Sequence, residues 1–281
     1  MKEVFLNPFI QTSLIAAFLA SFASGIIGSY VIIKRIVFIS GSIAHSVLGG
    51  MGFFLWLSRT YHIPWLSPLF GAFIASIFSS ILIGWIHLRF RERKDAIIAS
   101  VWSTGMAIGV IFIALTPGYT TELMNFLFGN ILWTTPTDLY LLLILDLIIL
   151  ISVGIYYQQF LAISFDEEQA RVNGLNVTYY YFFLLILIAI SVVLLIQVIG
   201  IILVIALLSL PPMIASLFSK KLIHMMGLSV LLALSFNFFG ILISYQLDWP
   251  MGATIALISA ISYLLTLGVK KRITQSRIKF H

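Results

Sequence analysis

Long apolar runs separated by short polar breaks make up almost the whole chain. Each run is at least about 20 residues, the length that an α-helix needs to cross the hydrocarbon core of a bilayer. The run Tyr179–Phe218 is about forty residues, too long for one crossing, so we expect two spans that fold near Gln197–Gly200. The predicted spans are Pro8–Ile33, Val37–Ser58, a third from the turn Pro64–Pro68 to the cluster Arg89–Lys94, Asp95–Thr116, Thr137–Phe160, the two within Tyr179–Phe218, Leu222–Tyr245 and Met251–Val269.

This pattern predicts an all-α polytopic membrane protein of about nine transmembrane helices. Eight or ten spans would also fit the runs, and would move the N-terminus to the other side of the membrane. Between Thr120 and Thr135 lies a segment with Asn125, Gly129 and Asn130 that is too short to cross. We expect a surface or re-entrant helix there.

Composition agrees with this class of protein. Of the 281 residues, 61% are hydrophobic and 9% are charged, and the mean hydropathy is +1.10, whereas soluble domains carry about 25% charged residues. The chain has no cysteine, which excludes disulfides and thiolate metal ligands. No soluble stretch is long enough to fold alone, so residues 1–281 are predicted to form one membrane domain.

The basic residues test the topology. With nine spans, nearly all of them fall on one face, and only Lys2 and Arg59 fall opposite. By the positive-inside rule the basic face is cytoplasmic, so the C-terminus is predicted inside the cell and the N-terminus outside. The residues on the basic face are Lys34–Arg35, Arg89–Lys94, Arg171, Lys220–Lys221 and Lys270–Arg272.

One polar island, residues 164–176, interrupts the apolar sequence on this cytoplasmic side. Ser164 followed by Glu167 is typical of a helix N-cap with its capping box, and the acidic residues 166–168 suit the first turn of a helix. Asn173–Gly174 favours a left-handed C-terminal cap. We therefore predict a surface helix of roughly ten residues, too short to span the bilayer and available to a partner outside it.

His45 is the strongest candidate for chemistry. In a helix, Gly41, His45 and Gly49 lie on one face, with Ser42 and Ser46 on the adjacent row. An imidazole among small residues indicates a groove or a closely packed helix, and imidazole binds zinc well and manganese less well. The alternative is a structural histidine that hydrogen-bonds a neighbouring carbonyl or Ser46 and holds two helices together.

Two aspartates are further candidates for the metal path. Asp146 lies in the middle of a span, where a carboxylate is costly and is a functional hypothesis by default. The alternative is an acid that is kept neutral or bonded to a neighbouring helix. Asp248 is predicted at the outer end of a span, where it could attract cations or simply cap a loop.

Two helix-packing features carry no chemistry of their own. Pro211–Pro212 lies deep in a span and is expected to interrupt the hydrogen-bond ladder, which is tolerated where neighbours or a cavity satisfy the freed carbonyls. Gly105 and Gly109 have the small-xxx-small spacing of packed membrane helices.

Several motifs of enzymes are absent. The sequence has no G-x-x-x-x-G-K-[ST] phosphate loop, no H-E-x-x-H zinc motif and no G-x-S-x-G elbow. Nothing in the chain argues for an enzyme, and ATP is not bound through a phosphate loop.

Over nearly its whole length the chain resembles the permease subunits of bacterial ABC importers for zinc, manganese and iron. Three blocks, in order and at the expected separations, carry this resemblance. They are Gly28–Arg35 running on to Ser42–Ser46 and Gly49–Gly50, then Phe165–Ala170 with Gly174 and Gln197–Pro211, and finally Leu242–Tyr245 with Asp248 and Pro250–Gly252.

The resemblance implies a type II ABC importer-like fold in the bacterial cytoplasmic (inner) membrane. It implies a homodimer with a path along its two-fold axis, two ATPase subunits on the cytoplasmic side and a metal-binding protein outside. It makes the polar island a coupling helix that fits a groove on the ATPase, and it implies no tightly bound cofactor, the metal ion being cargo. The coupling residues would be Phe165, Asp166, Glu167, Glu168, Ala170, Arg171 and Gly174.

By the same resemblance, His45 matches a histidine that binds metal in the channel. Many members carry an aspartate four residues before it, where this chain has Gly41. The site therefore loses a hard oxygen ligand, which weakly favours zinc over manganese. Asp146 could replace that ligand only if its span packs on the span of His45.

Two other functions remain open at this stage. A secondary metal/proton antiporter would use Asp146 and His45 as a relay and need no ATPase, but such carriers usually pair two or more intramembrane acids. An ABC permease for a siderophore or cobalamin would favour a wider, aromatic-rich channel without a central histidine.

Overall fold

Helices account for all the regular structure in the described part of the chain. The computed structural model describes residues 8–63, 65–89, 94–118, 124, 126, 129, 131 and 134–278. Nine helices of these residues are long and apolar enough to cross a membrane, as predicted. They are α2 (Pro8–Ile33), α3 (Val37–Tyr61), α4 (Pro68–Arg89), α5 (Lys94–Leu115), α7 (Pro136–Phe165), α9 (Val177–Ile199), α10 (Ile201–Phe218), α11 (Leu222–Leu247) and α12 (Met251–Ile278).

The boundaries follow the sequence pattern to within one or two residues, with three larger differences. Helix α3 runs three residues beyond the predicted end, α7 continues to Phe165, and α12 continues through the basic tail to Ile278. The long apolar run divides where it was expected to, because Gly200 has φ +77° and separates α9 from α10. Most of the segment 120–135 lies outside the described residues, so the prediction of a surface or re-entrant helix stays a prediction.

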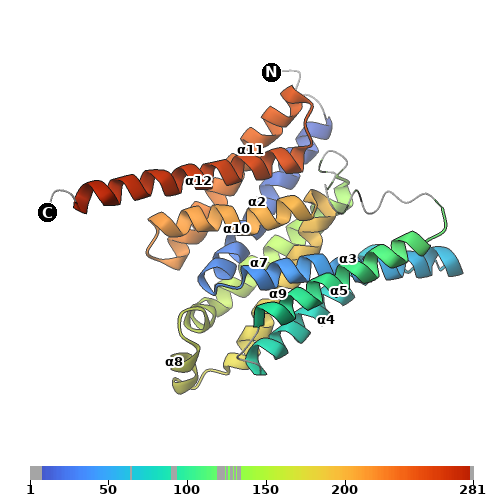
Figure 1. Ribbon diagram of the computed structural model, residues 1–281, viewed down its shortest axis with the longest axis horizontal. Helices are drawn as coiled ribbons and strands as arrows, with labels where there is room; N and C mark the ends of the chain where they lie inside the picture. Colours follow the sequence, from blue (N-terminus) through green and yellow to red (C-terminus); the bar gives the residue numbers. More distant parts are fainter. Residues whose placement is uncertain are drawn as a thin grey trace.

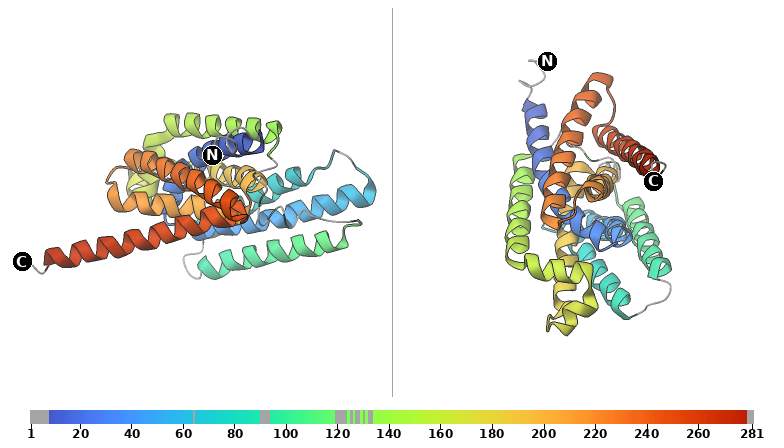
Figure 2. Two further views of the ribbon diagram at one scale, coloured as in Figure 1. Left: turned by 90° about the horizontal axis from the view of Figure 1, so that it is seen from above. Right: turned by 90° about the vertical axis from the view of Figure 1, so that its left-hand side faces the viewer.

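Helix α9 lies at the centre of the fold. It packs against α4 and α7 on its sides and contacts α2, α3 and α10, and nearly all of its residues from Leu184 onward are buried. Figure 1 shows α3, α4 and α5 extending together to one side of this centre. Both views of Figure 2 place α7 on one flank of the molecule and α5 on the opposite flank.

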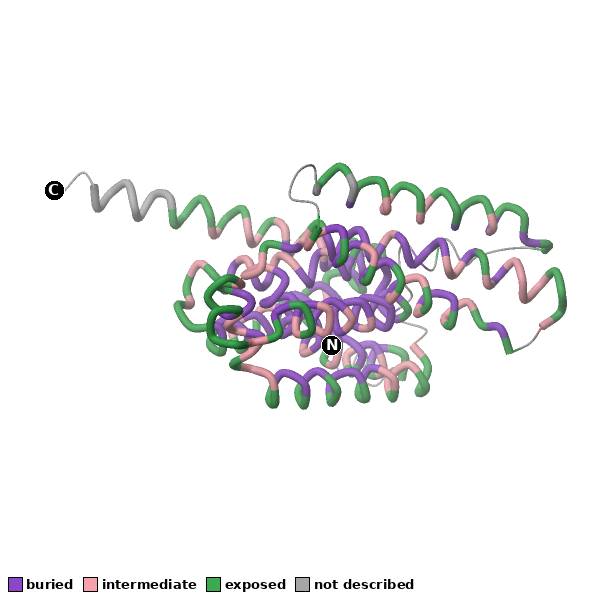
Figure 3. Tube along the Cα trace, turned by 90° about the horizontal axis from the view of Figure 1, so that it is seen from below, coloured by how far each residue is buried: buried purple, intermediate pink, exposed green. Residues whose placement is uncertain are grey.

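Buried residues concentrate in the middle of the bundle, and the flanking helices carry exposed residues on their outer sides (Figure 3). The share of buried residues is highest in α2 and α9 and lowest in α5 and α12. Exposed apolar side chains are normal for helices that face lipid or a second membrane chain. The outer faces of α5, α7 and α12 are therefore the surfaces available to the membrane or to another protein.

Glycines bring α3 close to its neighbour α5. A Cβ atom built on Gly49 would lie 2.9 Å from the carbonyl oxygen of Gly105, and one on Gly52 would lie 2.5 Å from that of Gly109. Membrane helices associate through such small residues because lipid gives no hydrophobic driving force between helices. The packing role predicted for Gly105 and Gly109 is confirmed.

The proline pair does not end its helix. Helix α10 continues through Pro211 and Pro212, and both are buried. Pro212 has no N–H for the carbonyl of Leu208, and Gly28 of α2 approaches that carbonyl so closely that a Cβ on Gly28 would lie 2.5 Å from its oxygen. The interrupted ladder is thus covered by a packed neighbouring helix.

Candidate functional site

His45 lies on the face of α3 that packs against α5. Its imidazole ring is stacked on the indole of Trp102, with ring centroids 4.1 Å apart and planes at 11°. The ring is half-buried, and its Nδ1 atom is buried without a hydrogen-bond partner among the described residues. A buried nitrogen without a partner is costly, so His45 carries an unsatisfied polar atom for which the described residues supply no hydrogen bond.

The two serines beside His45 donate hydrogen bonds to different helices. Ser42 donates to the carbonyl of Ile98 on α5 (2.9 Å), and Ser46 donates to the carbonyl of Ile43 in its own helix (2.9 Å). A hydrogen bond from His45 to Ser46, the structural alternative raised from the sequence, is therefore not what fixes the ring. Stacking on Trp102 fixes it instead. A Cβ on Gly41 would meet Trp102 at 3.9 Å, an ordinary contact, so the position has room for a side chain.

Asp146 lies on a different part of the bundle. It is buried on α7, and its Oδ1 atom has no hydrogen-bond partner among the described residues. The main packing partners of α7 are α2 and α9, whereas those of α3 are α5 and α4. Within one chain Asp146 therefore does not supply the carboxylate that His45 lacks, and a separate role for it stays a prediction.

Asp248 caps α11 at the end opposite the polar island. It adopts a left-handed backbone conformation with φ +53°, and its N–H donates to the carbonyl of Ser244. The residue is exposed. This geometry is that of a loop-cap aspartate, and its role at an entrance for cations stays a prediction. The described residues contain no group of three or more histidine and acidic side chains that could hold a metal ion.

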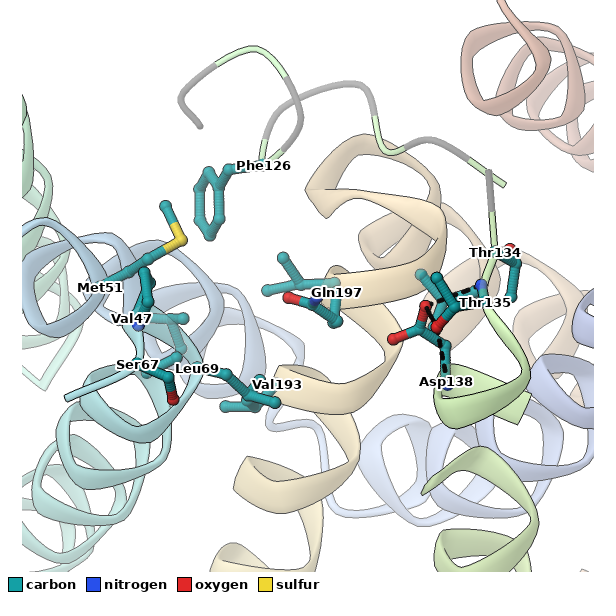
Figure 4. Close-up of a pocket in the computed structure, with 14 residues that line it drawn as sticks. Val47, Met51, Ser67, Leu69, Phe126, Thr134, Thr135, Asp138, Val193 and Gln197 are labelled. Atoms are coloured by element: carbon teal, nitrogen blue, oxygen red, sulfur yellow. Dashed lines mark hydrogen bonds between the residues drawn. The ribbon is translucent and has the colours of Figure 1, made fainter. Parts of the chain in front are cut away.

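A cavity of about 480 Å³ opens at the end of the bundle away from the polar island. Its walls come from α3, the start of α4, the start of α7 and the last turns of α9 (Figure 4). Gln197 is exposed in this cavity although Leu194–Ile196 and Val198–Ile199 around it are all buried. The sequence pattern placed Gln197 at a turn and in a block that carries the family resemblance, but indicated no role for it in a cavity. A lone amide in an apolar run was the available signal that it faces a cavity.

Two further side chains offer ligand atoms in this cavity. Asp138 uses its Oδ2 atom to accept bonds from the N–H and hydroxyl of Thr135 (3.0 and 2.7 Å), which caps α7. Figure 4 shows its other carboxylate oxygen directed toward the side on which Gln197 lies, with the thioether of Met51 on the opposite wall. The cavity thus combines oxygen and sulfur atoms that divalent transition metals accept as ligands.

The polar island forms a short helix, α8 (Glu167–Val172). The predicted cap is wrong: Ser164 and Phe165 belong to α7, and Asp166 is the N-cap, its carboxylate accepting from the N–H of Gln169 (2.9 Å). Helix α7 continues through these two residues, so the cap falls on the next residue that can act as one. The helix therefore has six residues rather than ten.

The end of α8 agrees with the prediction. Gly174 has φ +83°, and the N–H of Leu175 donates to the carbonyl of Ala170 at 3.1 Å, a Schellman-type ending. Ala170 is the buried anchor of this helix. Phe165 and Val172 are exposed at 67% and 82%, and Glu168 and Arg171 are exposed beside them. Apolar and charged side chains are thus both exposed within eight residues of the chain, and exposed apolar side chains that cluster are a feature of protein-binding sites.

Comparison with known proteins gives a consistent result. Residues 7–270 match the model of the ABC 3 transport family. The chain is 48% identical over 264 residues to a protein of Chlamydia trachomatis described as "Probable metal transport system membrane protein", covering 94% of this chain and 90% of that protein. It is 30% identical over 257 residues to the "Manganese transport system membrane protein MntC" of Listeria monocytogenes, covering 92% and 89%.

A solved structure has the same fold. The complex described as "PsaBC from Streptococcus pneumoniae in complex with Fab" contains a chain that matches with a TM-score of 0.82 and 29% identity, over 95% of both chains. These matches favour a metal permease over the secondary antiporter and over the permease for a siderophore or cobalamin.

Proposed function

This chain belongs to the ABC 3 transport family as the permease subunit of a metal importer, and we propose that it imports manganese or zinc as a homodimer. An external binding protein delivers the metal, and the ATPase, a separate subunit in these systems, docks on α8. The observation that carries the docking part is the exposed patch of Phe165, Glu168, Arg171 and Val172, on the side that the positive-inside rule makes cytoplasmic.

The docking proposal predicts the effect of reversing charge on α8. The double variant Glu168→Lys/Arg171→Glu is expected to reduce co-purification of the ATPase subunit by about tenfold, since charge reversal within an interface opposes association by roughly 1.4 kcal/mol or more. The measurement is the ratio of ATPase to permease after affinity purification in detergent. Asp248→Lys, a charge reversal at an exposed residue at the other end of the bundle, is the control. An unchanged ratio in the α8 variant would contradict docking at this patch.

His45 is proposed as a transient metal ligand. Its Nδ1 atom has no partner among the described residues, and Trp102 holds the ring in place from one face. A transporter must release what it binds, so one imidazole from each copy, completed by water, suits passage better than a closed site. Two imidazoles favour zinc on ligand type, whereas the similarity to a manganese permease favours manganese.

The cavity around Gln197 is proposed as the outer entrance to the path. Gln197→Leu removes the exposed amide from the cavity and is expected to raise the metal concentration for half-maximal uptake several-fold, about the effect of losing one polar contact of roughly 1 kcal/mol. Gln197→Glu adds a carboxylate and is expected to lower it. Uptake of ⁵⁴Mn and ⁶⁵Zn into reconstituted vesicles measures both. Equal half-saturation in all three proteins would remove the cavity from the path.

A further inference from the structure

Lys34 makes an unusual set of contacts for a residue at the end of a membrane span. It directly follows α2, yet its side chain is only 5% exposed. Its Nζ atom lies 2.6 Å from the Oε1 atom of Glu167 on α8 and donates to the carbonyl of Ile163 on α7 at 2.8 Å. The same atom lies 4.8 Å from the centre of the Tyr181 ring on α9. Four helices therefore meet at one ammonium group.

The energetics of this contact are those of a buried ion pair. Burial lowers the pKa of Lys34, and the hydrogen bond and charge of Glu167 oppose that shift. A buried ammonium is costly unless its donors are satisfied, and here a carboxylate, a carbonyl and an aromatic face satisfy them. Glu167 is 33% exposed, so its carboxylate can be hydrated if Lys34 is lost. The ammonium of Lys34 would instead be left in the protein interior if Glu167 were lost.

The position of the pair suggests a mechanical role. Helix α8 packs on α7 and α9, the helices on either side of it in the sequence. The bond to Lys34 ties it in addition to α2, which is far from it in sequence. Helix α2 in turn packs along α7, α10 and α11, and its Gly28 contacts the proline-interrupted turn of α10. A displacement of α8 must therefore either move α2 with it or break this bond.

We propose that the Lys34–Glu167 pair is the joint that transmits movement of α8 to α2 and so couples ATP hydrolysis to metal transport. This inference rests on the proposed function, in which α8 docks on the ATPase subunit. Lys34 is a positioning residue: it touches neither the metal nor ATP. Its loss is expected to leave docking and hydrolysis in place and to lower the metal imported for each ATP hydrolysed.

The test uses the full complex of permease, ATPase and external binding protein in vesicles, with Mn²⁺ and Zn²⁺ as cargo. Lys34→Met/Glu167→Gln removes both charges and leaves no unpaired buried ion, an exchange that proteins often tolerate. Lys34→Arg keeps a cation that can donate to both the carboxylate and the carbonyl. Arg35→Gln is the matched control, because Arg35 is the adjacent basic residue and is exposed. Metal uptake, ATP hydrolysis and the amount of bound ATPase subunit are measured in the same vesicles.

The double variant is expected to import roughly tenfold less metal per ATP, within the range of about 5- to 150-fold typical of coupling between two sites. Lys34→Arg and Arg35→Gln are expected to stay close to wild type. A wild-type ratio in the double variant would overturn the proposal, and so would loss of the bound ATPase subunit, which would make the pair a docking element. The charge reversals on α8 test docking itself, so the two failures are distinguishable.

A second variant tests the role of the Lys34–Glu167 pair if the double variant does not fold. Glu167→Asp keeps the charge but shortens the side chain by one methylene, which breaks the 2.6 Å contact while the partly exposed carboxylate remains hydrated. It is expected to lower the metal imported per ATP at unchanged ATPase binding. A wild-type ratio in this variant overturns the joint equally.

Discussion

Replacing His45 by alanine is expected to reduce metal uptake by about 10- to 100-fold, the loss typical when a group that supports a metal site is removed. His45 is the expected ligand because its Nδ1 atom has no hydrogen-bond partner among the described residues, and because these residues contain no group of three or more histidine and acidic side chains that could hold the metal instead. Uptake of ⁵⁴Mn and ⁶⁵Zn in parallel, with ATPase binding and hydrolysis recorded in the same vesicles, measures the effect.

Comparing how far the uptake of each metal falls distinguishes between the possible ligand sets. If two imidazoles dominate the site, zinc uptake falls more than manganese uptake, because manganese relies more on oxygen ligands. The control is His62→Asn, a histidine at the C-terminal end of the same helix whose left-handed backbone, φ +53°, asparagine tolerates. Wild-type uptake of both metals in His45→Ala would reduce His45 to a packing residue that stacks on Trp102.

The parts of the fold that depend on length and composition were predictable. A bilayer fixes how many apolar residues one crossing needs, so the runs predicted about nine spans, and the excess length of the longest run predicted that it divides, which it does at Gly200. The cap of α8 was not placed correctly, because Ser164 and Asp166 are both good N-cap residues. Only the continuation of α7 through Phe165 decides between them.

Contacts between helices that are distant in sequence determine the features that the sequence did not predict. The sequence singled out His45, but nothing in it indicated that Trp102, on another span, would lie at 4.1 Å from the ring. Lys34 has the sequence position of an ordinary cytoplasmic flanking residue. Its burial depends on Glu167 and Tyr181, more than 130 residues away, and this is why the joint became visible only in the assembled bundle.

The close contact between α3 and α4 leads to the second prediction with a large expected effect. Replacing Gly50 by alanine is expected to destabilise the permease severely. A Cβ on Gly50 would lie 2.2 Å from the carbonyl oxygen of Gly71 and 2.5 Å from the Cβ of Ala75. Because the nearest atom is backbone, the two helices must separate, which places the cost near the upper end of the usual range for overpacking, about 3 kcal/mol. For a chain of this size the expected fall in the midpoint of thermal unfolding is roughly 10 °C, measured by size-exclusion chromatography after heating in detergent.

The matched control is Gly227→Ala, the same substitution inside α11, where nothing lies within 4 Å of the new Cβ. This change is expected to leave the midpoint unchanged or raise it slightly, since alanine is favoured over glycine in a helix by about 0.5–1 kcal/mol. A midpoint for Gly50→Ala equal to that of Gly227→Ala would contradict the close approach of α3 and α4. Because α3 also carries His45, the Gly50 variant that survives purification should import less metal as well, and Gly227→Ala should not.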